Sequence, residues 1–349
     1  MSGFAIAGRA IGDGAPCFVI AEAGVNHNGR VELALKLIDV AAEAGADAVK
    51  FQTFRPERLA SPQAEKAAYQ KATTGAGESQ LDLLRRLAFS DADFAALKRH
   101  CERRGILFLS SPFDEESVDF LDRLGVAAFK IPSGEVVNTP LLARIGAKRK
   151  PVILSTGMAT LAEVEGAVTA LAAAGCTEMA ILQCVSNYPA EPADANLRAM
   201  DTLAAAFGRP VGYSDHTLGL EVALASVARG AAVLEKHFTL DKSLPGPDHR
   251  CSLEPAELRA LMRGVRAVEA ALGSGRKAPA AAEADVAAVA RRSLFLRGAV
   301  AAGTMLEAGD LIALRPGDGI GPGLLPQIVG RRTRRALPAG HKLGWEDLA

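Results

Sequence analysis

The segment 211–237, VGYSDHTLGLEVALASVARGAAVLEKH, contains one complete strand–helix–strand unit and decides the fold. Residues 211–214 and 232–236 are short apolar runs of the length expected for buried strands. The alanine-rich stretch between them has a helical pattern and ends near Gly230, a residue type that commonly follows the last turn of a helix. Buried strands that alternate with helices are typical of a parallel sheet.

The same unit recurs along the chain. Short apolar runs predict eight strands, at residues 17–21, 48–52, 106–110, 127–131, 152–155, 179–183, 211–214 and 232–236. Glycine again follows several of the intervening helical patterns, as at Gly45, Gly105 and Gly125. Eight such units predict an α/β fold of the (β/α)8 TIM-barrel type. The alternative is a doubly wound open sheet, but no Gly-x-Gly-x-x-Gly sequence follows the first strand to support it.

The chain changes in character beyond the predicted barrel. We expect the barrel over residues 1–273, a linker at 274–290 and a second domain at 291–349. The second domain is basic and rich in glycine and proline, and runs at 293–296 and 312–314 predict short strands in a small, mostly β structure. Within the barrel, the long polar segment 53–86 predicts a loop that covers a substrate.

The overall composition narrows the class of protein. The chain has 349 residues, is 49% hydrophobic, and balances 40 Lys and Arg against 40 Asp and Glu, which gives no reason to expect a nucleic-acid or membrane partner. No apolar run has the length of a transmembrane helix, and residues 1–10 lack a secretion signal. The five cysteines form no Cys-x-x-Cys pair, so we expect reduced thiols in a cytoplasmic protein.

Polar side chains gather where the predicted strands end. They are Glu22, Lys50, Gln52, Ser111, Lys130, Ser133, Ser155, Ser186, Tyr188, Ser214, His216 and His237. Because the active site of a (β/α)8 barrel lies at the C-terminal ends of its strands, this distribution predicts an enzyme.

Two histidines follow adjacent strands. His216 comes after the seventh strand and His237 after the eighth, a placement that suits one divalent metal whose other ligands are water or substrate oxygens. The alternative is a pair of hydrogen-bonded core histidines. Glu22, on the first strand, is a candidate for the metal shell or for positioning a water, and its alternative is an ion pair with Lys50.

Cations and hydroxyls converge on the same predicted cavity. They are Lys50, Lys130, Ser133, Ser155, Ser186 and Ser214. Such a set suits a small anion with phosphate and carboxylate groups. A Schiff base on a buried lysine, as in class I aldolases, is the alternative. Asp248 lies in the loop after the eighth strand and suits either contacts with sugar hydroxyls or a simple turn.

Many segments, in order along the chain, resemble the sialic acid synthase family. They are IAEAGVNHNG at 20–29, VKFQT at 49–53, SSPFD at 110–114, FKIPSGE at 129–135, LSTGM at 154–158, GYSDHT at 212–217, EKHFT at 235–239 and GPDH at 246–249. The segment RPGDG at 315–319 resembles the antifreeze-like (SAF) domain of that family. The resemblance spans nearly the whole chain.

The resemblance implies a transferase that condenses phosphoenolpyruvate with an open-chain N-acyl mannosamine-type sugar and releases phosphate by C–O cleavage. The phosphoenolpyruvate phosphate would contact Lys130, Ser133, Ser155, Ser186 and Ser214. Its carboxylate would contact Lys50 and Ser111. Mn2+ or Mg2+, held by His216 and His237, would activate the aldehyde, and Glu22 would help to orient a water.

The resemblance also implies how the sugar is held. Gln52, Tyr188 and Asp248 match positions that face the acceptor. Arg315 would reach the N-acyl group from the partner's tail in a domain-swapped homodimer. Ser186 stands where some members have Asn, and Leu314 stands where many have Lys, a change at the outer edge of the sugar site.

The acceptor sugar is open between two candidates. N-acetylmannosamine, which gives N-acetylneuraminate, is the first, and 2,4-diacetamido-2,4,6-trideoxymannose, which gives legionaminate, is the alternative. Gly134 argues against the pseudaminate branch, whose members tend to have Phe at this position. A further hypothesis is a phosphate-binding barrel that is not a synthase and whose basic tail binds a partner.

Overall fold

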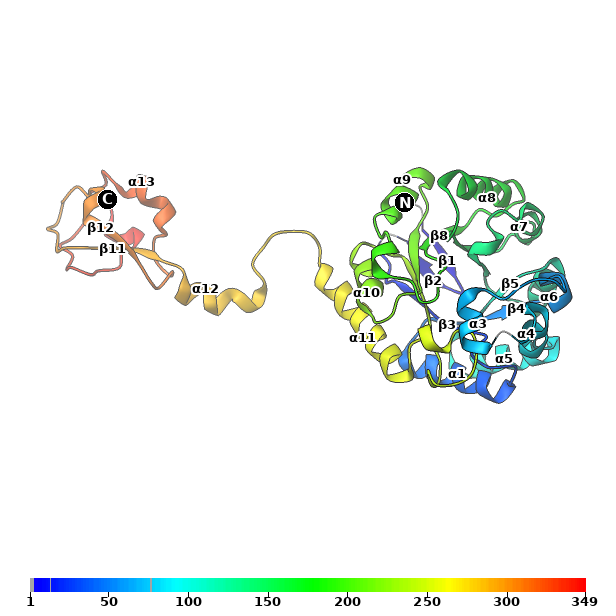
Figure 1. The fold of residues 1–349 in the computed structure, drawn as a ribbon. Coiled ribbons are helices and arrows are strands. Elements are labelled where there is room, and N and C mark those ends of the chain that lie inside the picture. The colour runs from blue at the N-terminus through cyan, green and yellow to red at the C-terminus, as the bar shows by residue number, and fades with distance from the viewer. Residues whose placement is uncertain (1–2, 13, 76) are drawn as a thin grey trace. The chain divides into compact units, whose positions relative to one another are not determined.

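A computed structural model describes residues 3–12, 14–75 and 77–349 (Figure 1). The chain divides into two compact units, Met1–Gly273 and Ser274–Ala349. The strands of the first unit are β1 (Phe4–Ile6), β2 (Arg9–Ile11), β3 (Phe18–Gly24), β4 (Ala48–Thr53), β5 (Leu107–Pro112), β6 (Phe129–Ile131), β7 (Val152–Ser155), β8 (Met179–Cys184), β9 (Val211–Asp215) and β10 (Val233–His237). Its helices are α1 (Val31–Ala44), α2 (Pro56–Leu59), α3 (Ala68–Thr74), α4 (Gln80–Leu87), α5 (Asp91–Arg104), α6 (Glu115–Leu124), α7 (Thr139–Gly146), α8 (Leu161–Ala173), α9 (Ala199–Phe207), α10 (Glu221–Ala228) and α11 (Pro255–Leu272).

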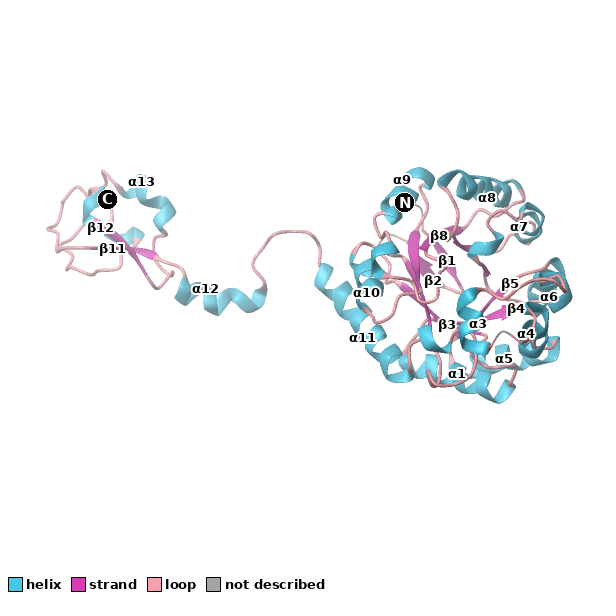
Figure 2. Cartoon of the chain, in the orientation of Figure 1, coloured by secondary structure: helices cyan, strands magenta, loops and turns pink. Residues whose placement is uncertain are grey.

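Eight parallel strands form one sheet in the order β5-β4-β3-β10-β9-β8-β7-β6. Neighbours in this order are consecutive in the chain, except that β3 pairs with β10 and so joins the first repeat to the last. The helices surround the strands (Figure 2). The predicted TIM-barrel fold is therefore confirmed, and the open-sheet alternative is wrong.

Helix ends follow the local sequence signals. Gly45, Gly105 and Gly125 adopt left-handed conformations directly after α1, α5 and α6, and their N–H groups bond to carbonyls of the last turn. Asp114 caps α6 by accepting a hydrogen bond from the Ser117 N–H. Asp114 thus fixes where α6 begins, and the three glycines end their helices where the chain turns into the next strand.

A short hairpin covers the N-terminal end of the barrel. Strands β1 and β2 pair antiparallel, and the turn between them places Ala7 and Gly8 at positive φ. Ile6 and Ile11 pack with Phe18 in the inner apolar cluster of the barrel. The sequence analysis did not identify these strands, because three residues each are too few to show a period.

The segment 53–86, predicted as a loop, contains helices α2 and α3 and most of α4. Ser79 accepts a hydrogen bond from the Asp82 N–H and so caps α4. Leu83, Leu84 and Leu87 of α4 pack with Val25 and Phe54, which hold the segment against the barrel. The loop prediction was wrong for these residues because helices of four to eight residues have too little periodicity to detect.

The second unit is small and mostly irregular. Its elements are α12 (Ala284–Ala290), β11 (Ser293–Leu296), β12 (Leu311–Leu314) and α13 (Leu325–Ile328). β11 and β12 pair antiparallel over a cluster that includes Leu294, Ile320 and Leu343. The last seven residues of the predicted linker form α12. None of the helices described is long and apolar enough to span a bilayer.

Candidate active site

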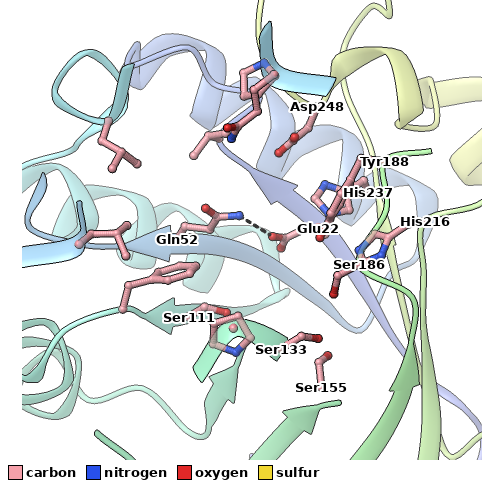
Figure 3. A pocket seen from close by; sticks show the side chains of 18 of the residues that line it. Glu22, Gln52, Ser111, Ser133, Ser155, Ser186, Tyr188, His216, His237 and Asp248 are labelled. Atoms are coloured by element: carbon pink, nitrogen blue, oxygen red, sulfur yellow. Dashed lines mark hydrogen bonds between the residues drawn. The ribbon is translucent and has the colours of Figure 1, made fainter. Parts of the chain in front are cut away.

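A cavity of about 520 Å³ opens at the C-terminal ends of the barrel strands (Figure 3). All the predicted site residues except Arg315 line it. Arg315 lies in the second unit, where it directly follows β12 and is exposed. We call the strand-end residues Glu22, Lys50, Lys130, Ser155, Ser214 and Glu235 the cavity floor, and Leu59, Leu83, Leu84 and Leu87 of α2 and α4 the cavity rim.

Two buried lysines occupy the cavity floor. Lys50 Nζ lies 3.1 Å from Ser111 Oγ and 3.1 Å from Glu22 Oε1. Lys130 Nζ lies 2.7 Å from Ser155 Oγ. Both lysine side chains are at most 5% exposed, so each ammonium group sits beside a serine hydroxyl in a site that excludes most water. This is a suitable place for a multiply charged anion, because cations and hydroxyls donate hydrogen bonds to its oxygens.

Glu235 joins the two lysines, and the sequence analysis gave it no role. Its Oε1 lies 3.3 Å from Lys130 Nζ and accepts a hydrogen bond from Ser214 Oγ, and its Oε2 lies 3.5 Å from Lys50 Nζ. Burial alone would raise the pKa of Glu235, but Lys130 and Lys50 outweigh it and bring the pKa to about 2. Its position in the sequence could have predicted this role. Residues two apart on a strand point to the same face, so Glu235 faces the same side as His237.

Glu22 is the second carboxylate of the floor. Burial raises the pKa of Glu22 to about 7, against the opposing effect of Lys50. Its Oε2 has no hydrogen-bond partner within the part of the chain that the structure describes. Figure 3 shows Gln52 Nε2 donating to Glu22 Oε1, at 3.5 Å. A carboxyl group with one free oxygen and a pKa near neutrality can hold either a water or a proton.

The two histidines face each other across β9 and β10, with ring centroids 5.3 Å apart. His216 Nδ1 lies 2.6 Å from the Val185 carbonyl oxygen. Because a carbonyl only accepts, Nδ1 carries the proton and Nε2 keeps a lone pair in the neutral ring. Burial, with a contribution from His216, holds the pKa of His237 well below the usual range. Burial also opposes the charge of His216, but the Cys184 thiol and the Val185 hydrogen bond outweigh it and raise the pKa of His216. Tyr188 stacks beside both rings, 4.1 Å from that of His216.

The histidine pair fits a divalent metal ion in part. An imidazole binds a metal in its neutral form, and the Val185 hydrogen bond orients His216 as outer partners orient metal-bound histidines. The buried His237 Nδ1 has no hydrogen-bond partner among the described residues. Nowhere in the described ranges do three or more His, Cys, Asp or Glu side chains form a metal-holding group, so other ligands would have to be water or substrate oxygens.

The β7–α8 turn brings backbone close to the serines. Gly157 N donates to Ser133 Oγ at 2.9 Å. A Cβ atom at Gly157 would lie 2.3 Å from Ser186 Oγ, so only glycine lets this turn approach both hydroxyls. Cys184, one of the five thiols to which the sequence assigned no site role, also lines the cavity here.

Asp248 faces the cavity from the loop after β10 (Figure 3). Burial raises the pKa of its carboxyl to about 6, with His216 acting in the opposite direction. Its backbone carbonyl accepts a hydrogen bond from Ser252 Oγ at 2.6 Å, and Asn26 Nδ2 donates to the same Oγ at 2.9 Å. The segments after the first and last strands of the barrel, β3 and β10, thereby fix the position of Asp248.

The cavity rim is apolar. Leu59, Leu83, Leu84 and Leu87 line the cavity together with Val25, and the uncharged polar residues Ser61, Gln70 and Gln80 of the same segment also reach it. Among the described lining residues, the only lysines are the two of the floor, and no arginine is present. The side of the cavity away from the floor therefore offers no fixed cation to a ligand.

Comparison with known proteins matches both units. The NeuB family model covers residues 37–277, and the SAF domain model covers residues 291–349. N,N'-diacetyllegionaminic acid synthase of Legionella pneumophila is 47% identical over 97% of this chain and 96% of its own length. N-acetylneuraminate-9-phosphate synthase of Homo sapiens is 38% identical over 93% of this chain and 91% of its own length.

Solved structures give the same result. The N-acetylneuraminic acid (sialic acid) synthetase of Leptospira borgpetersenii superposes with a TM-score of 0.72 at 36% identity, covering 82% of this chain and 95% of that one. The resemblance inferred from the sequence motifs is thereby confirmed. With family models matched over both units and relatives aligned over almost the full length, the chain belongs to the NeuB family and carries a C-terminal SAF domain.

Proposed function

We propose that the protein is a phosphoenolpyruvate-dependent nonulosonic acid synthase, a transferase. The observation that carries the proposal is the floor, where two buried lysines each contact a serine hydroxyl and share Glu235. Phosphoenolpyruvate has a phosphate and a carboxylate at neighbouring positions, so it matches two separate cationic sites. A Schiff base on Lys50 is disfavoured, since the buried glutamates beside it raise the pKa of its amine despite burial, whereas burial lowers the pKa of the Lys130 amine.

The anion is divided between the two lysines. Lys130 binds the phosphate together with Ser133, Ser155, Ser186 and Ser214, which surround it on the cavity wall. Lys50 and Ser111 bind the carboxylate. Lys50, Lys130, Ser111, Ser155 and Ser214 are buried, and Ser133 and Ser186 are partly buried. Donors held in this way stabilise charge on the departing phosphate with little rearrangement.

The reaction joins C3 of phosphoenolpyruvate to the aldehyde carbon of the open-chain sugar. His216 and His237 would hold Mn2+ or Mg2+, which supplies Lewis-acid polarisation of the aldehyde oxygen. The aldehyde oxygen takes up a proton and becomes a hydroxyl group of the product. Glu22 Oε2, which has no partner among the described residues, accepts a hydrogen bond from the water that adds at C2 and takes the proton that this water loses. The bond between C2 and the phosphate-bearing oxygen then breaks, the new C2 hydroxyl loses its proton as C2 becomes a ketone carbon, and phosphate leaves into the contacts of Lys130 and the serines.

The rim favours an uncharged and partly apolar acceptor. Without a lysine or arginine among the described lining residues on this side, a sugar phosphate would find no fixed counter-charge. A 2,4-diacetamido-2,4,6-trideoxymannose presents two acetamido methyl groups and a 6-methyl group to Leu59, Leu83 and Leu87. The 47% identity with a diacetyllegionaminic acid synthase supports the same acceptor, so we place this sugar ahead of N-acetylmannosamine, reversing the order preferred from sequence.

N-acetylmannosamine stays as the second candidate because a sialic acid synthetase superposes with a TM-score of 0.72. Mass spectrometry of the product decides between them. The full-length protein is incubated with phosphoenolpyruvate, Mn2+ and each sugar in turn, and kcat/KM is compared. We expect a nonulosonic acid from both and the higher kcat/KM for the diacetamido sugar. Phosphate release without formation of a nine-carbon product would contradict the synthase.

We also propose a domain-swapped homodimer in which Arg315 of one copy reaches the sugar's N-acyl group in the other. The support is the match of the tail to the SAF domain and the exposure of Arg315. An arginine hydrogen bond of about 1.5–3 kcal/mol predicts that Arg315→Ala raises the acceptor KM by roughly tenfold or more. A truncated 1–273 chain with undiminished turnover would exclude this role.

A further inference from the structure

A buried ion pair lies immediately beside the histidine pair, and the proposed reaction does not use it. Lys236 Nζ lies 2.6 Å from Asp215 Oδ2, and the two side chains are 1% and 0% exposed. Asp215 precedes His216 at the end of β9, and Lys236 precedes His237 at the end of β10. The strand register sets Lys236 directly opposite Asp215.

This pair lies on the outer face of the barrel wall. Successive residues of a strand point to opposite faces, and Ser214, Glu235 and His237 line the cavity. Asp215 and Lys236 alternate with them and are absent from its lining. The ion pair therefore contacts no part of a ligand in the cavity.

Both members of the ion pair also form hydrogen bonds with Thr217, the residue after His216. Asp215 Oδ1 accepts hydrogen bonds from the Thr217 N–H at 3.0 Å and from Thr217 Oγ1 at 2.8 Å. Lys236 Nζ donates to the Thr217 carbonyl oxygen at 2.7 Å. Lys236, the residue before His237, therefore contacts the residues on both sides of His216.

The position of the His237 ring depends on these contacts more than that of the His216 ring does. The ring of His216 has its own anchor in the Val185 carbonyl. The Nδ1 atom of His237 has no hydrogen-bond partner in the described ranges, so the backbone of β10 and ring packing must set its position. In addition to the pairing of β9 with β10, the Lys236 side chain ties this end of β10 to the segment that carries His216.

We infer that Asp215, Lys236 and Thr217 form a clamp that sets the spacing of His216 and His237 for a divalent cation. The inference rests on the proposed function, which assigns the metal to these histidines. A role in stability alone explains the pair less well, because replacing a buried ion pair by apolar side chains of similar size is often neutral or stabilising. The three residues are positioning residues and touch no reactant.

The test measures Mn2+ affinity by isothermal titration calorimetry on the full-length protein without phosphoenolpyruvate or sugar. Lys236→Met should weaken Mn2+ binding by roughly 10- to 100-fold, the range found when partners of metal-binding histidines are removed. At saturating Mn2+, the KM for phosphoenolpyruvate should change little, because the floor lysines are untouched. The matched control is Lys242→Met, which breaks the ion pair with Glu257 at the surface and should leave Mn2+ affinity unchanged.

A second variant removes the cost of leaving Asp215 buried and uncompensated. Asp215→Leu combined with Lys236→Met replaces both charges by apolar groups, so it should unfold at about the wild-type temperature while still binding Mn2+ at least about tenfold more weakly. If Lys236→Met does not fold, this double variant decides. Mn2+ affinity within about twofold of wild type in a folded variant would overturn the clamp, since that lies below the expected range.

The clamp and the proposed function fail in different ways. A wild-type protein that makes a nonulosonic acid but binds no divalent cation would overturn the clamp and leave the synthase standing. A wild-type protein that binds Mn2+ and loses this affinity in both variants, yet forms no product, would support the clamp and overturn the synthase.

Discussion

The floor and the rim of the cavity are held together by different forces. On the floor, Lys50, Lys130, Glu22 and Glu235 are buried and paired, so a shift of one side chain leaves another charge without a partner. On the rim, leucines of α2 and α4 pack on Val25 and Phe54, and apolar contacts tolerate changes of size and shape better.

This difference separates two tasks. The floor has a fixed geometry that suits an anion whose charges do not vary. The rim is built on helices of four and eight residues in the segment between β4 and β5, so a few substitutions there change the choice of acceptor without disturbing the charged network. We therefore expect substitutions on the floor to affect the reaction itself and substitutions on the rim to affect selectivity.

The largest expected effect comes from the histidines above the floor. His216→Ala removes one proposed metal ligand, and Lewis-acid stabilisation is worth several kcal/mol, so turnover should fall by roughly 10³-fold or more. Phosphate release at saturating substrates and Mn2+ measures this. His100→Ala, which removes a histidine paired with Asp39 outside the cavity, is the control. If turnover of the His216 variant stays within about tenfold of wild type, His216 does not hold a metal that contributes several kcal/mol to catalysis.

The next largest effect concerns the anion. Lys130→Met removes a charge-assisted contact worth about 1.5–3 kcal/mol, so the KM for phosphoenolpyruvate should rise by roughly 10- to 150-fold. Initial rates at varied phosphoenolpyruvate measure it. Lys98→Met, which breaks a surface pair with Glu102, should change nothing. An increase in the acceptor KM alone would show that this lysine binds the sugar.

The unfolding free energy should depend on pH through Glu22, which belongs to the floor. The pKa of Glu22 is about 7 in the folded protein and near its ordinary value of 4.5 when unfolded, so the folded state binds more protons between these values. Stability conferred by this group is therefore lost as pH rises from 4.5 through 7. Relative to Glu22→Gln, the wild type should lose roughly 2–3 kcal/mol of unfolding free energy between about pH 5 and about pH 8.

Guanidinium unfolding of both proteins at the two pH values gives this difference. The pKa of Glu235, about 2, lies below the range, so its own titration does not contribute. Curves that stay parallel would mean that Glu22 is ionised throughout and already paired with Lys50.

The smallest expected effect lies on the rim. Leu59→Asn places an amide against the methyl groups of the acceptor, and a methyl group in an apolar pocket is worth roughly tenfold in selectivity. The ratio of kcat/KM for the diacetamido sugar over N-acetylmannosamine should fall by about that factor. Leu272→Asn, at an exposed position at the end of α11, is the control. An equal loss for both sugars would show that Leu59 does not discriminate between them.

Much of the fold could be predicted because its signals are local. Most barrel strands begin with a run of apolar residues, and glycines mark helix ends at Gly45, Gly105 and Gly125. Elements of three to eight residues, such as β1, β2, α2 and α4, carry no period long enough to recognise. They exist because Ile6, Ile11 and Leu83 are buried against the barrel, which is a property of the whole fold.

The sequence by itself determined which side chains meet at the mouth of the barrel, because parallel strands of one barrel all end on the same side. The tertiary structure decided how they pair. Glu235 joins Lys50 to Lys130, and Lys236 reaches Asp215 rather than the cavity. These partners are 21 to 185 residues apart in the chain and are selected by strand register and burial, which forces each charge to find the nearest opposite charge or hydrogen-bond acceptor.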